Sequence, residues 1–183
     1  MLPETIVNEK TIYEGEVLDL RLRQVQLRDG ATASREIISN NGAVAIVAIT
    51  AQKEVRLVRQ YRAAAQKWVL EIPAGGLEAG EDPDQAAPRE LLEETGDRAT
   101  TWHKLHGTYS APGVLTEFVH LYLAMDLTPG PNNLEFDEHI EVVTVPWPEA
   151  IGMIRRHEIE DGKTIAGLLT VGLYLGWLAN VAP

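Results

Sequence analysis

Cysteine is missing from this sequence of 183 residues, and serine occurs only at positions 34, 39 and 110. The lack of cysteine excludes disulfide bonds, zinc sites built on thiolates and catalysis by a thiol nucleophile. No serine lies in the Gly-x-Ser-x-Gly pattern of a nucleophile elbow, and the five histidines show no metal-ligand spacing. The sequence therefore leaves catalysis to carboxylates, arginines and bound ions.

Basic residues are also few: 16 Lys and Arg stand against 27 Asp and Glu, which gives a formal net charge of −11. This balance argues against nucleic acid or an anionic membrane surface as a partner. An acidic protein that handles a phosphorylated substrate needs cations between the two, and metal ions are the usual ones. The hydrophobic content of 45% is typical of a globular domain that buries a core.

Targeting and membrane-spanning signals are not found in the sequence. The N-terminal residues MLPETIVNEK lack the basic start and the apolar core of a signal peptide. Residues 165–181 carry no charge, but the stretch is short for a membrane span and contains three glycines. It predicts a buried helix, and we expect a cytoplasmic protein.

The N-terminal part of the chain predicts a small antiparallel β unit. Residues 17–27 alternate between apolar and polar side chains, which is typical of a half-buried strand. Asp29-Gly30 then predicts a turn, and residues 31–38 a returning strand. The turn residues Asn40-Asn41-Gly42 mark a boundary. We expect an N-terminal β unit of residues 1–41 and a larger domain of residues 42–183.

The larger domain predicts strands mixed with a few helices, which indicates an α/β or α+β fold. Residues 43–49 are continuously apolar and rich in β-branched side chains, as in a strand buried on both faces. Asp82 is placed to cap a helix that has Pro83 at its first position. The predicted strands are 43–49, 55–61, 68–72, 101–110, 118–125 and 140–145, and the predicted helices are 83–95, 148–157 and 163–178.

The helix predicted at 83–95 is rich in carboxylates. Glu90 and Glu94 lie four residues apart and so share one face, which Glu93 borders. Such a cluster is repulsive unless a cation lies within it, and oxygen ligands without histidine or cysteine favour Mg²⁺ or Mn²⁺ over zinc. Glu81 can fold back towards the same ions, and Arg89 can hold a carboxylate by a bidentate pair. The alternative is an ordinary solvated acidic helix, which does not explain the leucines between the acids.

One spaced motif covers this region. It reads Gly75, five residues, Glu81, seven residues, Arg89-Glu90-Leu91, one residue, Glu93-Glu94, one residue, Gly96.

This motif resembles the Nudix box. The resemblance implies the Nudix fold, a mixed β-sheet sandwiched between helices, and hydrolysis of a nucleoside diphosphate linked to another moiety. It implies that Glu90 and Glu94 are the main metal ligands, with Glu93 as a supporting ligand and the Ala74 carbonyl as a backbone ligand. It also places Arg89, together with Glu93, in the catalytic machinery.

Two positions of the segment depart from ordinary expectations. The box normally closes with an apolar residue, and Asp97 stands there instead. We expect Asp97 to alter the packing where the chain leaves the helix. Pro88 lies inside the predicted helix, where proline removes one backbone hydrogen bond and costs about 3 kcal/mol or kinks the axis.

The resemblance extends to the ADP-ribose pyrophosphatase branch of the family. Residues 58–62 (VRQYR) and 70–75 (LEIPAG) are similar to the lead-in of that branch. Ser110-Ala111-Pro112-Gly113 resembles its Ser-Pro-Gly, with one alanine inserted, and Glu117 follows where the branch often carries an acid.

The substrate contacts and the general base follow from the same resemblance. The resemblance implies a glutamate on the loop before a late strand as the base that activates water; Glu138 takes this position, and Glu135 is the alternative. The residues implied to contact substrate are Arg35, Arg62, Pro112 and Glu117, with Arg59 as a nearby candidate. The alternative for these arginines is a set of salt bridges on a strand surface, because exposed arginines are ordinary, and only the resemblance makes the two interpretations equal.

One further stretch resembles a phosphate-binding motif. Asp161-Gly162-Lys163-Thr164 is similar to the end of a P-loop, but the glycine that a P-loop needs five residues before Gly162 is His157. The stretch is therefore not interpreted as a nucleotide site.

The sequence thus predicts Mg²⁺-dependent hydrolysis of ADP-ribose, or a related ADP-sugar, to AMP and ribose 5-phosphate, with Mn²⁺ as a substitute ion. The alternatives are another substrate, such as GDP-mannose, NADH or FAD, and a Nudix module that senses nucleotides without catalysis. Because residues 1–41 are too small to bury a core and the family commonly exchanges this unit between subunits, we expect a homodimer.

Overall fold

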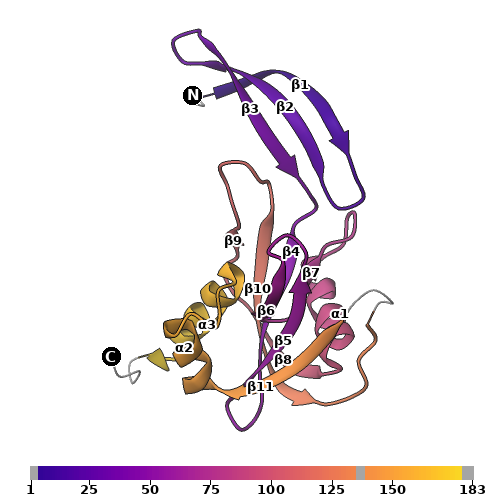
Figure 1. The fold of residues 1–183 in the computed structure, drawn as a ribbon, viewed down its shortest axis with the longest axis vertical. Helices are drawn as coiled ribbons and strands as arrows, with labels where there is room; N and C mark the ends of the chain where they lie inside the picture. The colour runs from indigo at the N-terminus through magenta and orange to yellow at the C-terminus, as the bar shows by residue number, and fades with distance from the viewer. Residues whose placement is uncertain (1–3, 135–138, 179–183) are drawn as a thin grey trace. The chain divides into compact units, whose positions relative to one another are not determined.

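The computed structural model describes residues 4–134 and 139–178 (Figure 1). The chain divides into two compact units, which are described separately. One unit holds the N-terminal residues through Gly42 together with Tyr109–Phe118, and the other holds Ala43–Thr108 and the residues from Val119 onward. The division into two domains at residue 41 remains a prediction.

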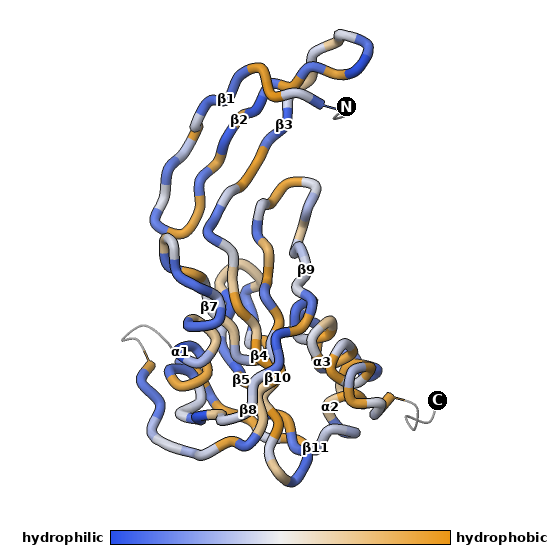
Figure 2. The backbone as a smooth tube through the Cα atoms, turned by 180° about the vertical axis from the view of Figure 1, so that it is seen from behind, coloured by the Kyte–Doolittle hydropathy of each residue, from blue (hydrophilic) through white to orange (hydrophobic). Residues whose placement is uncertain are grey.

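The first unit is built on a three-stranded antiparallel sheet in the order β1 (Glu4–Glu14), β2 (Asp19–Leu27), β3 (Thr32–Ser39). Both hydrophobic and hydrophilic residues lie along these strands (Figure 2). The predicted turn is confirmed: Gly30 has a φ of 86°, which favours glycine. The sequence did not predict β1, because two register shifts in its pairing with β2 interrupt the alternation of side chains.

The loop from Tyr109 to Phe118 packs on β3 within the first unit. The backbone N–H of Ile38 donates to the carbonyl of Val114 at 2.7 Å, and the N–H of Thr116 donates to the carbonyl of Ile38 at 2.9 Å. These two hydrogen bonds, both formed by Ile38, hold the loop alongside β3.

The second unit contains a mixed sheet in the order β11-β5-β4-β10-β8, in which β4 and β10 are parallel and the other neighbours antiparallel. Two short strands extend it, since β6 pairs with β5 and β7 pairs with β4. The strand predicted at 101–110 is two strands, β8 and β9. The bounds are β4 (Ala43–Ile49), β5 (Glu54–Arg62), β6 (Lys67–Glu71), β7 (Ala74–Gly76), β8 (Arg98–Lys104), β9 (Thr108–Tyr109), β10 (Phe118–Thr128) and β11 (Ile140–Pro146).

Helices cover both faces of this sheet: α1 (Pro83–Thr95) lies on one side, and α2 (Trp147–Arg155) with α3 (Gly162–Tyr174) on the other (Figure 1). The predicted burial of β4 on both faces is confirmed. Each face of the strand belongs to a different hydrophobic cluster. Val44, Ile46 and Ala48 pack with α1, and Ala45, Val47 and Ile49 pack with α2 and α3.

The helix predicted at 163–178 begins and ends slightly earlier, at Gly162 and Tyr174. Its buried side faces the sheet through Leu168 and Val171. Within the described ranges, none of the helices has both the length and the apolarity that crossing a membrane requires.

Candidate active site

Helix α1 carries the carboxylates, and local signals in the sequence set its ends. Asp82 accepts a hydrogen bond from the N–H of Asp84 at 3.0 Å, as an N-cap does. Gly96 ends the helix with a φ of 77°, in the left-handed region. The helix is continuous through Pro88. The predicted start, cap and end of this helix are confirmed.

A polar pocket of about 370 Å³ lies between α1 and the ends of β5 and β7. All three carboxylates predicted from the helix face contribute to its wall, as does the predicted backbone ligand. Its lining residues are Gln60, Arg62, Ala74, Gly75, Gly76, Glu78, Arg89, Glu90, Glu93 and Glu94.

The guanidinium of Arg89 donates hydrogen bonds to three carboxylates. Its Nε and Nη2 donate to the two oxygens of Glu81 at 3.0 and 2.9 Å, which is the predicted bidentate pair. Its Nη1 donates to Glu90 at 2.7 Å and to Glu93 at 2.9 Å. The hydrogen bond from Arg89, helped by the backbone N–H of Glu78, holds the pKa of Glu81 below its usual range. Glu81 therefore orients Arg89, and Arg89 orients the helix carboxylates.

The backbone of β7 also contacts two of the helix carboxylates, Glu90 and Glu94. A Cβ built on Gly75 would lie well inside 3 Å of the Glu90 carboxylate, so this carboxylate packs directly on the glycine backbone. The buried carboxylate of Glu94 accepts a hydrogen bond from the N–H of Ala74 at 3.0 Å. Strand β7 thus forms a cradle that holds Glu90 and Glu94 beside Ala74.

Two of the predicted metal ligands, Glu90 and Glu93, accept hydrogen bonds from an arginine in this arrangement. In the part of the chain that the structure describes, no group of three or more His, Cys, Asp or Glu side chains lies close enough to hold a metal ion. Arg89 instead supplies the positive charge between Glu90 and Glu93. The predicted ligands nevertheless fit a hard divalent cation in kind, since carboxylate and carbonyl oxygens are what such ions bind. The cradle at Gly75 is consistent with a carboxylate held in one position.

The two arginines of β5 differ in their placement. Arg62 lines the pocket, and its guanidinium forms two hydrogen bonds of 2.7 Å with the buried carboxylate of Glu71. Arg59 is exposed and pairs with Glu141 at 3.5 Å. Residues an odd number apart in a strand face opposite sides. The structure therefore brings Arg62 to the carboxylates and leaves Arg59 away from them.

Three predicted substrate contacts belong to the first unit. Arg35 donates to Glu4 at 2.5 Å and to the Ser34 carbonyl at 3.1 Å. Pro112 lies in the loop that packs on β3, and at its end Glu117 accepts a hydrogen bond from Asn40 at 2.8 Å.

The two candidates for the general base, Glu138 and Glu135, lie outside the described residues. The described part of the same loop contacts α1, because the N–H of Asn133 donates to the carbonyl of Glu93 at 3.0 Å. A Cβ on Gly96 would collide with the carbonyl of Gly130, which shows how closely this loop approaches the end of the helix.

Asp97, which departs from the expected apolar residue, has a structural partner. Its side chain is 3% exposed and accepts a hydrogen bond from Nε of Arg56 at 2.8 Å. The same guanidinium donates to the hydroxyl of Thr144 on β11. Asp97 thus joins the end of α1 to β5 and β11 through a buried ion pair.

Comparison with known proteins agrees with this geometry. The model of the NUDIX domain matches residues 40–168, which include the whole of α1 and its carboxylates. This chain belongs to the Nudix family. It is 38% identical to the ADP-ribose pyrophosphatase of Bacillus subtilis, over 89% of each chain. It is also 38% identical to the methanol dehydrogenase activator of Bacillus methanolicus, over 90% of each chain. A solved structure of an ADP compounds hydrolase has the same fold, with a TM-score of 0.86 over 100% of this chain and 98% of that one, at 22% identity.

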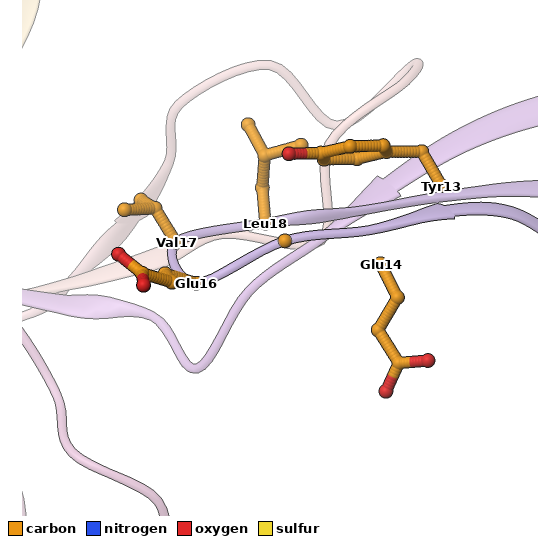
Figure 3. A pocket seen from close by; sticks show the side chains of 6 residues that line it. Tyr13, Glu14, Glu16, Val17 and Leu18 are labelled. Atoms are coloured by element: carbon orange, nitrogen blue, oxygen red, sulfur yellow. The ribbon is translucent and has the colours of Figure 1, made fainter.

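This Nudix protein has a second hollow at the turn between β1 and β2, where Tyr13 and Leu18 lie on one side of the hairpin and Glu14 points to the other (Figure 3). It contains no residue of the Nudix box. The predicted metal ligands line the pocket on α1 instead.

Several pocket residues of the Nudix domain were not predicted. Gln60 and Glu78 line the cavity, and Glu71, which does not line it, accepts two hydrogen bonds from Arg62. Glu71 had one visible signal, since it is a lone acid between the apolar residues Leu70 and Ile72. Its partner Lys163 had none, because the two residues are 92 positions apart.

Proposed function

We propose that this Nudix protein hydrolyses the diphosphate bond of ADP-ribose to AMP and ribose 5-phosphate with the help of a divalent metal ion. The observation that carries the proposal is the pocket, whose lining includes Arg62 together with the three carboxylates of Glu90, Glu93 and Glu94. Carboxylates for a cation and a guanidinium for phosphate are the two groups that a diphosphate substrate requires. The relative in Bacillus subtilis supports ADP-ribose as the substrate.

The metal site consists of Glu90 and Glu94, with Glu93 as a supporting ligand and the Ala74 carbonyl as a backbone ligand. A bound Mg²⁺ or Mn²⁺ would neutralise the negative charge that develops on the diphosphate. Arg89 and Glu81 keep the carboxylates in place, as their hydrogen bonds support. The hydrogen bond from Ala74 to Glu94 orients the second main ligand.

The substrate is bound and the water activated by residues outside the helix. Arg62 binds a phosphate oxygen, which a partly exposed guanidinium is suited to do. Glu138 removes a proton from the attacking water, with Glu135 as the alternative base. The contact between Asn133 and the backbone of Glu93 supports this loop as the source of the base.

The first unit contributes further contacts to the substrate through Arg35, Pro112 and Glu117, and joins two chains in a homodimer. Strand β1 supports this, because all but the first of its residues are exposed, Ile6, Val7, Ile12 and Tyr13 among them. Light scattering at micromolar concentration is expected to give the mass of a dimer, and a monomer would contradict this part of the proposal.

A substrate panel tests the proposal. ADP-ribose, GDP-mannose, NADH and FAD are incubated with the protein and Mg²⁺, and phosphate is measured after a phosphatase removes it from the products. We expect the highest kcat/KM for ADP-ribose. Glu90→Gln and Glu94→Gln are expected to lower kcat by about two orders of magnitude or more while the protein stays folded. Near-normal turnover in both variants would contradict the metal assignment.

A second candidate function is a nucleotide-binding module that regulates a partner protein. The relative in Bacillus methanolicus favours it, because that protein is named an activator of a dehydrogenase. The presence of every carboxylate of the Nudix box favours catalysis instead. Tight binding of ADP-ribose without formation of AMP, in Mg²⁺ and in Mn²⁺, would support the second candidate.

A further inference from the structure

The turn that resembles a P-loop forms the start of α3. Asp161 is the N-cap and accepts hydrogen bonds from the backbone N–H of Thr164 at 2.9 Å and from its hydroxyl at 2.6 Å. Lys163 projects from the first turn of the helix and lies 3.1 Å from Asp161. These contacts fix the side chains of two consecutive residues, Lys163 and Thr164.

Both side chains reach the end of β6. The hydroxyl of Thr164 is completely buried and accepts a hydrogen bond from the N–H of Ile72 at 2.8 Å. The ammonium group of Lys163 donates to the carboxylate of Glu71. Two consecutive residues of α3 therefore hold Glu71, the last residue of β6, and Ile72, which follows it, immediately before the backbone turns into Ala74 and the carboxylate cradle.

Glu71 is shared between two cations. It is 2% exposed and accepts hydrogen bonds from Arg62 as well as from Lys163. Burial alone would raise the pKa of Glu71, but the hydrogen bonds from Arg62 and the charge of Lys163 outweigh burial and lower it. A carboxylate buried this deeply requires a cation beside it.

The two cations differ in what else they can reach. The side chain of Lys163 is 21% exposed and does not line the carboxylate pocket, whereas that of Arg62 is 42% exposed and lines it. If Lys163 neutralises Glu71, the positive charge of Arg62 is available to a second anion at the pocket. Without Lys163, Arg62 would be the only cation among the described residues that is hydrogen-bonded to Glu71.

We propose that Lys163 is a positioning residue for substrate binding, which neutralises Glu71 and so leaves the guanidinium of Arg62 available to a phosphate of the substrate. This inference rests on the proposed function of the pocket. It assigns a role to the turn Asp161–Thr164: the turn holds the residue that binds phosphate and does not bind phosphate itself.

A double-mutant cycle between Lys163 and Arg62 tests the inference. We expect Lys163→Met to raise KM for ADP-ribose about tenfold with kcat within about twofold, because a binding contact is weakened and the metal ligands are untouched. We expect the same Lys163→Met change to have no effect on KM in an Arg62→Ala background, because its effect passes through Arg62. Lys163→Arg, which keeps the charge, is expected to restore KM to within about threefold of the wild type.

Lys67→Met is the matched control. Lys67 lies on the same strand as Glu71, and its substitution also removes one positive charge. Its partner, however, is the exposed Glu160. Its KM is expected to stay within about twofold of the wild type. The affinity for ADP-ribose without metal, measured by calorimetry, is expected to fall for Lys163→Met and not for Lys67→Met. Circular dichroism checks the fold, and Lys163→Gln replaces Lys163→Met if the latter does not fold, with the same expectations.

The outcomes separate this inference from the proposed function. A wild-type protein that forms no AMP from ADP-ribose with Mg²⁺ or Mn²⁺ overturns both. An active wild-type protein in which Lys163→Met leaves KM unchanged, or raises it equally with and without Arg62, overturns the role of Lys163 alone. An equal rise in KM for Lys67→Met also overturns it, because the effect would then be one of overall charge.

Discussion

Gly75→Ala changes the cradle of the proposed metal site by a single methyl group. Gly75 has an ordinary backbone conformation, since it is not among the glycines with positive φ. The new Cβ would lie well inside 3 Å of the Glu90 carboxylate, whereas ordinary contacts begin near 3.4 Å. The carboxylate must therefore retreat by about 1 Å or more, because atoms at shorter separations repel steeply.

The expected loss of activity follows from this displacement. Glu90 is 9% exposed and accepts a hydrogen bond from Arg89, so its carboxylate has little space in which to move. A displacement of about 1 Å at a catalytic group costs about 10²-fold in rate, or about 2.7 kcal/mol of activation free energy. We expect kcat with ADP-ribose and Mg²⁺ to fall by this factor.

Gly76→Ala is the control for this prediction. Gly76 is the next residue, lies on the same strand and has nothing within 4 Å of a built Cβ. We expect its kcat to stay within about threefold of the wild type, because no catalytic group is moved. Steady-state kinetics and urea unfolding are measured for both variants. Equal kcat values for two folded variants would refute the argument that Gly75 is required for the position of Glu90.

Three further predictions concern folding stability. Arg56→Met leaves the buried Asp97 without its cation, so we expect urea unfolding to show a loss of about 3 kcal/mol and the double variant Arg56→Met/Asp97→Leu to recover most of it. The pKa of Glu71 is lower in the folded chain than in the unfolded chain. The ionised Glu71 therefore contributes its full share of the folding stability above the pKa of the unfolded chain, near 4.5, and this contribution is lost as the pH falls through the pKa of the folded chain. Unfolding measured across this range is expected to show the stability difference between wild type and Glu71→Gln shrinking in acid. Asp82→Ala removes the cap of α1 and should lower the unfolding free energy by about 1 kcal/mol.

Local signals explain why α1 was predicted so closely. An N-cap at Asp82, a proline at the first position and a glycine at Gly96 act within a few residues of each end, and the structure begins and ends the helix where they indicate. The same holds for the turn at Gly30. In contrast, β1 pairs with β2 through two register shifts, and such shifts leave no alternating pattern to recognise.

Contacts between distant residues explain what the sequence did not predict. The three predicted carboxylates of the pocket, Glu90, Glu93 and Glu94, come from one helix, so their spacing alone predicts a common face. Arg56 and Asp97 are 41 positions apart, and Lys163 and Glu71 are 92 positions apart. Such ion pairs form only because strands and helices from different parts of the chain pack together. Asp97 therefore looked like an exception to a motif, whereas in the structure it is one half of a buried ion pair.

The central claim is that the pocket on α1 hydrolyses ADP-ribose with a divalent metal ion, and product analysis tests it most directly. The wild-type protein is incubated with ADP-ribose and Mg²⁺, and the nucleotides are separated and quantified by chromatography, with and without a chelator. We predict equal amounts of AMP and ribose 5-phosphate, no product in the presence of the chelator, and recovery when Mg²⁺ is added in excess. ADP-ribose that remains intact with folded protein and either Mg²⁺ or Mn²⁺, or product that forms equally in the chelator, would contradict the claim.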